Sequence, residues 1–135
     1  MPVTGQGPSG LDNIEAVLSA IQGQIDKNSR GLRVLYALMF EGLGDDSLLR
    51  ERFRAFHASV RRDFAERIAA GQADGSIRTT LDPAAEAAFI VSGMRGVGYQ
   101  WLLDPDDFDA SGVFAHFAAV AVAVGRLQSQ GHRRE

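Results

Sequence analysis

Apolar residues recur at intervals of three and four positions along most of the chain, which is the spacing of one buried face of an α-helix. The segment with Leu32, Leu35, Tyr36, Met39 and Phe40 shows this pattern clearly. No stretch has the alternation of a credible strand. The pattern therefore predicts an all-α fold of five helices, over residues 11–25, 32–40, 48–73, 83–103 and 110–128.

Capping residues mark where several of these helices begin and end. Gly75 follows the third segment and is a typical C-terminal stop, while Asp46 or Ser47 can cap the start of that segment. Asp82 directly before Pro83 combines an N-cap acceptor with a proline in the first turn, which predicts the start of the fourth helix. The connector between these two helices is therefore expected to be structural and to bind nothing itself.

Length and composition indicate one domain of a soluble protein. The chain has 135 residues, and we place one helical domain at residues 11–128 between flexible tails at 1–10 and 129–135. It has no cysteine, which excludes disulfides and thiolate metal sites. A net charge of −3 is the wrong sign for a nucleic-acid-binding domain. We find no signal peptide and no apolar run long enough to span a membrane, so a cytoplasmic location is expected.

Residues that could carry catalysis or bind a metal are sparse. The three histidines His57, His116 and His132 are far apart in sequence, and no pair has the spacing of metal ligands on a helix. We therefore predict no metal, no cofactor and no catalytic residue. A small helical enzyme with His57 as its base stays an open alternative, although no carboxylate near it in sequence could orient the ring.

The fourth and fifth predicted helices are apolar around most of their circumference, and a monomer of this size cannot easily bury both. Their small residues would allow close approach of helices. We therefore expect a homodimer in which two copies of this helix pair form a four-helix bundle about a two-fold axis. The predicted interface residues are Gly93, Gly96, Gln100, Val113, Phe117, Val120, Ala121 and Val124.

Aromatic residues and methionines on the second, third and fourth predicted helices could face one another. Such a group can line an apolar cavity with a few polar tips, as small-molecule sites do, although a packed core would give the same pattern. The candidate ligand-binding residues are Tyr36, Met39, Phe40, Phe53, Phe56, His57, Val60, Phe64, Met94, Arg95 and Trp101. Tyr36, His57 and Arg95 are the polar groups among them that could orient a ligand.

The stretch "GQADGSIRTTLDPAAEAAFIVSGMRGVGYQWLLDP" resembles the C-terminal regulatory domain of the tetracycline-repressor-like (TetR) family of bacterial transcriptional regulators. The resembling elements are Gly75, Ile77, Arg78, Leu81, Asp82, Pro83, Gly96, Val97, Gln100, Trp101, Leu102, Leu103 and Pro105. The number and order of the flanking helices also match, so the resemblance covers most of residues 11–128. It implies dimerisation through the last two helices and a cavity for a small apolar or amphipathic ligand among the second, third and fourth.

The family's DNA-binding unit, a helix-turn-helix, has no counterpart in this sequence. Since only a glycine-rich stretch precedes Leu11, we do not expect this chain to bind an operator itself. Whether it is a fragment of a longer regulator or a natural protein without a DNA reader stays open. A second interpretation is a pure interaction module with a filled core, which could pair with an intact relative.

Overall fold

The computed structural model describes residues 7–25, 27, 29–45 and 47–126. Five helices follow one another along them: α1 (Gly10–Ile25), α2 (Ser29–Glu41), α3 (Ser47–Asp74), α4 (Pro83–Leu103) and α5 (Ala110–Gly125). The described residues contain no β-strand, and one isolated bridge pairs Ile77 with Arg126. The predicted all-α fold of five helices is therefore confirmed. Asp46, the tail at 129–135, residues 127–128 of the predicted fifth helix and most of the tail at 1–10 lie outside the described residues.

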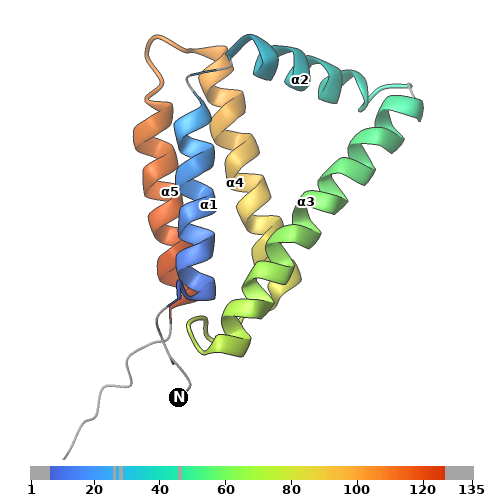
Figure 1. Cartoon of the computed structure of the whole chain (residues 1–135). Coiled ribbons are helices and arrows are strands. Elements are labelled where there is room, and N and C mark those ends of the chain that lie inside the picture. Colours follow the sequence, from blue (N-terminus) through green and yellow to red (C-terminus); the bar gives the residue numbers. More distant parts are fainter. Residues whose placement is uncertain (1–6, 26, 28, 46, 127–135) are drawn as a thin grey trace, which may run out of the picture.

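The helices form a bundle with one open corner (Figure 1). α1, α4 and α5 run alongside one another, and α3 leans away from them toward its N-terminal end, where α2 bridges the gap. The core lies where α1, α3, α4 and α5 meet. Its most completely buried side chains are Leu18, Ile68, Ile77, Ile90 and Phe114. None of these five side chains is on α2.

The connector between α3 and α4 ends one helix and begins the next, as predicted. Gly75 adopts a φ of 84°, the left-handed conformation in which a glycine costs least. The Ser76 N–H then donates to the Gly71 carbonyl at 2.9 Å. At the other end, Asp82 caps α4 by accepting a hydrogen bond from the Ala84 N–H at 3.1 Å.

The same connector also holds the start of α1, which the sequence pattern did not indicate. Asp74 accepts a hydrogen bond from the Gly10 N–H at 2.6 Å, and the Ser76 hydroxyl accepts one from the Leu11 N–H at 3.0 Å. Two N–H groups that a helix start leaves unpaired are thereby satisfied from residues far away in sequence. A Cβ atom on Gly10 would overlap the backbone of Gly71, so the two helix ends are in direct contact.

Candidate ligand-binding cavity

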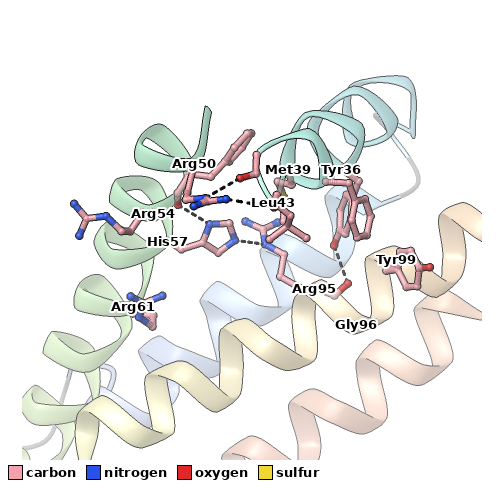
Figure 2. A pocket seen from close by; sticks show the side chains of 13 residues that line it. Tyr36, Met39, Leu43, Arg50, Arg54, His57, Arg61, Arg95, Gly96 and Tyr99 are labelled. Carbon is pink, nitrogen blue, oxygen red and sulfur yellow. Dashed lines mark hydrogen bonds between the residues drawn. The ribbon is translucent and has the colours of Figure 1, made fainter. Parts of the chain in front are cut away.

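A cavity of about 560 Å³ lies in the open corner between α2, α3 and α4. This volume is in the range of about 300–1,000 Å³ that is usual for small-molecule sites. Figure 2 shows the side chains that surround it. The lining residues are Tyr36, Met39, Phe40, Gly42, Leu43, Arg50, Phe53, Arg54, His57, Arg61, Arg95, Gly96 and Tyr99.

Tyr36 fixes α2 against α4 at the wall of the cavity. Its side chain is buried, and its hydroxyl donates a hydrogen bond to the Arg95 carbonyl oxygen at 2.9 Å (Figure 2). Burial raises the pKa of this hydroxyl, although the neighbouring Arg95 side chain lowers it in part. Gly98 makes the approach possible, because a Cβ atom there would overlap the Tyr36 hydroxyl.

Arg95 and His57 join α4 to α3 across the cavity. The Arg95 Nε–H donates to His57 Nε2 at 3.0 Å, and the other ring nitrogen, Nδ1, lies 2.9 Å from the Phe53 carbonyl oxygen (Figure 2). Since Nε2 accepts and the carbonyl can only accept, the ring proton must be on Nδ1 and the imidazole is neutral. The Arg95 guanidinium also lies 5.9 Å from the centre of the Tyr36 ring and 5.7 Å from that of Phe56, within the range of cation–π contacts.

Arg50 closes the end of the cavity where α2 turns into α3. Its guanidinium donates to the Gly44 carbonyl at 2.6 Å and more weakly to the Gly42 and Leu43 carbonyls at 3.4 Å. A cation is favourable here because the C-terminal end of α2 carries unpaired carbonyl groups and partial negative charge. Arg54 lies further along α3, is solvent-exposed and pairs with Glu51 at 2.7 Å.

Six of the eleven candidate ligand-binding residues line this cavity: Tyr36, Met39, Phe40, Phe53, His57 and Arg95. The other five lie elsewhere. Phe64 is a core residue with 2 % exposure, and Val60, Met94 and Trp101 are partly buried against the same core. Phe56 stacks edge-on against His57 at 5.5 Å between ring centres, so it contacts a lining residue without lining the cavity.

Several lining residues escaped the sequence prediction, and one group carried a readable signal. Arg50, Arg54, His57 and Arg61 follow one another at intervals of four, three and four, which is one face of a helix. Charged residues along one face of a helix usually mark a solvated face. The three arginines are solvent-exposed as expected, but this face of α3 also borders the cavity.

The predicted interface residues on α4 and α5 fall into distinct environments. Ala121 is in the core, and a Cβ atom on Gly93 would overlap the Phe117 ring of the same chain. Gly96 lines the cavity. Val113 and Val120 are each 39 % exposed. Gln100 is also exposed, while Phe117 and Val124 are partly buried.

Two other kinds of site were sought in the part of the chain that the structure describes. No three His, Cys, Asp or Glu side chains come together there as metal ligands would. None of the five helices combines the length and apolar character needed to cross a membrane.

A comparison with protein-family models identifies the chain. Residues 11–126 match the model of the C-terminal domain of BetI-type transcriptional repressors, a group of the TetR family. The chain belongs to this family. The match covers all five helices except Gly10, the first residue of α1, and it confirms the resemblance drawn from the sequence. Neither the curated proteins nor the solved structures gave a significant match. The match makes the chain a regulatory domain of the TetR type, the kind found in transcriptional regulators.

Proposed function

We propose that this TetR-type domain senses a small, largely apolar molecule in the cavity between α2, α3 and α4, and pairs with a second copy through α4 and α5 in the cytoplasm. The observation that carries the proposal is the cavity itself. Apolar side chains make up most of its wall, and Tyr36, His57 and Arg95 meet at one side of it. An apolar hollow with a few convergent polar groups is the usual form of a ligand site.

Exposed apolar side chains on α4 and α5 support the pairing. Phe89 is 44 % exposed and stacks on Phe117 at 5.7 Å, and Val113 and Val120 extend the same surface along α5. A monomer gains nothing from leaving such a patch in water, whereas a two-fold dimer would bury two copies of it. DNA binding is not proposed for this chain. The small molecule bound in the cavity would act by favouring one arrangement of the two subunits over another.

Catalysis by His57 is the weaker alternative. A general base needs a free ring nitrogen within reach of its substrate. Both ring nitrogens of His57 are engaged, one with the Phe53 carbonyl and the other with Arg95. The interaction module without a small ligand is separated from our proposal by the experiment below.

A thermal-shift screen with lipophilic compounds and acyl-CoA-type metabolites tests the ligand site. We expect at least one compound to raise the melting temperature of the wild-type protein and to have no such effect on Gly96→Leu. A Cβ atom on Gly96 meets no other atom within 4 Å, so a leucine there extends into the cavity. Gly23→Leu is the matched control, because Gly23 is equally open and lies on α1 away from the cavity.

Two results would contradict this part of the proposal. If no compound stabilises the wild-type protein, the interaction module becomes the better interpretation. If Gly96→Leu responds as the wild type and Gly23→Leu do, the compound binds outside the cavity.

The dimer is tested by sedimentation at low protein concentration. We expect the wild-type chain to be a dimer and Val120→Glu to be a monomer, since a charge would be placed in an apolar interface. Ala119→Glu is the matched control, because Ala119 borders a separate hollow between α1 and α5. A wild-type chain that is monomeric at all concentrations would remove the pairing and leave the ligand site untouched.

A further inference from the structure

The charged side chains around the cavity all have the same sign. Arg50, Arg54, Arg61 and Arg95 border it, and no Asp or Glu among the described residues does. The whole chain nevertheless carries more acidic than basic residues, with a net charge of −3. The local excess of positive charge is therefore a property of this site and does not follow from overall composition.

Arg95 is the partly buried arginine of the lining with donor capacity left over, whereas Arg61 is exposed to solvent on α3. Arg50 is committed to backbone carbonyls at the end of α2, and Arg54 is paired with Glu51. Arg95 uses its Nε–H for the neutral His57 ring, and among the described residues no carboxylate forms an ion pair with it. A guanidinium has five N–H donors in a planar fork, so the terminal nitrogens of Arg95 can bind an anion as well as the neighbouring Tyr36 hydroxyl.

The polar side of the cavity argues against a cationic ligand. A ligand cation at this side would have to share the face of Tyr36, the lining ring that lies beside Arg95. The Arg95 guanidinium already lies 5.9 Å from the centre of this ring and 5.7 Å from that of Phe56. A second cation there would be repelled by Arg95 and would find no carboxylate in the described lining to compensate.

We propose that the ligand of this cavity is an amphipathic monoanion, with a carboxylate that the Arg95 fork binds and an apolar body that lies against Met39, Phe40 and Tyr99. This inference rests on the proposed ligand-sensing function and narrows it to one chemical class. Tyr99 and Phe40 contact each other at 5.5 Å between ring centres and form the apolar wall on the α2–α4 side.

The test compares three probes of equal chain length and different charge: octanoate, 1-octanol and octylammonium. Each is titrated into the full chain while ¹H–¹⁵N spectra report which backbone amides shift. We expect octanoate to shift the amides of His57, Arg95 and Gly96 and to bind about tenfold more tightly than octanol, since charge-assisted hydrogen bonds are roughly twice as strong as neutral ones. Octylammonium should bind more weakly than octanol.

Substitution of Arg95 then tests whether it supplies the preference. In Arg95→Met, the affinity for octanoate should fall to within about twofold of the affinity for octanol. Octanol should still bind, which would show that the cavity is intact. Arg95→Lys should keep part of the preference because it keeps the charge. Arg62→Met is the matched control on the outside of α3, and it should behave as the wild type.

The outcomes separate the inference from the function on which it rests. Octanol or octylammonium binding as tightly as octanoate at the cavity residues would overturn the anion preference and leave ligand sensing in place. An unchanged preference in Arg95→Met would equally overturn the role of Arg95. If none of the three probes shifts the cavity amides, both the inference and the proposed sensing function fail.

Discussion

Gly93 and Gly96 are three residues apart on α4, and the same substitution at each should have opposite effects on stability. Both were predicted to lie in the dimer interface. In the structure, a Cβ atom on Gly96 meets nothing within 4 Å, whereas one on Gly93 would lie 2.7 Å from Phe117 Cδ2 and still closer to two other atoms of that ring. The Phe117 ring cannot easily move away, because it is packed against Phe89 at 5.7 Å and Phe114 at 5.9 Å.

The expected magnitudes follow from these surroundings. Replacing glycine with alanine inside a helix gains about 1 kcal/mol of helix propensity. Gly96→Ala keeps this gain, so its free energy of unfolding should rise by about 0.5–1 kcal/mol. At Gly93 the overlap with Phe117 costs about 1–3 kcal/mol, which offsets the gain and leaves a net loss of about 1 kcal/mol. The two variants should therefore differ by about 2 kcal/mol.

Urea unfolding followed by circular dichroism measures this difference, with all proteins at one concentration because pairing would contribute to stability. A Gly93→Ala variant as stable as Gly96→Ala would refute the packing of Phe117 against α4. The same samples are diluted to measure self-association. If Gly96→Ala weakens it, Gly96 is an interface residue as the sequence predicted, and its place at the cavity is secondary.

Three further predictions concern the connector and the start of α4. Burial raises the pKa of the Glu86 carboxyl despite the nearby Arg78, so ionisation of this group at neutral pH destabilises the folded protein. Glu86→Gln should therefore be more stable than the wild type at pH 7. Urea unfolding at several pH values should show this difference in the free energy of unfolding become smaller toward pH 4. The pKa of Asp74 is lowered by hydrogen bonds from the Ser76 side chain and from the Gly10 and Ser76 N–H groups. The ionised carboxylate therefore stabilises the folded protein at neutral pH, and this stabilisation is lost as the pH falls through the lowered pKa. Asp74→Asn should therefore be less stable than the wild type at pH 7 and equal to it in strong acid, as thermal unfolding at several pH values would show. Gly75→Ala forces a side chain into the left-handed conformation and should lower the free energy of urea unfolding by about 1–2 kcal/mol.

The helices could be predicted from the sequence because their determinants are local. The apolar spacing, Gly75 in the left-handed conformation and the Asp82–Pro83 start each act within a few residues. The hydrogen bonds from α1 to the connector could not be predicted, because Gly10 and Asp74 are 64 residues apart and no periodicity relates them. Such a contact depends on how α1 and α3 cross.

The candidate site was predicted only in part, and the reason is the tilt of α3. Phe53 and Phe64 lie on one apolar stripe of that helix, and the sequence treats them alike. α3 leans away from the bundle toward its N-terminal end (Figure 1), so its C-terminal half contributes Phe64 and Ile68 to the core while its N-terminal half lines the cavity. Phe64 is therefore a core residue and Phe53 a cavity residue. The spacing of apolar residues identifies the side of a helix that faces inward. The tilt of the helix decides whether that side contacts the core or the cavity.

In the proposed regulator, α4 is the element through which a ligand could act on a partner copy. Arg95 bonds to α3 through its side chain and to α2 through its carbonyl oxygen. Phe89 and Gly93, six and two residues earlier on α4, contact Phe117 on α5. A carboxylate on the terminal nitrogens of Arg95 would bind at the contact between α4 and α3, next to the hydrogen bond to His57. Regulation follows if the two dimer arrangements differ in this contact, because a ligand shifts an equilibrium only by its difference in affinity for the two states.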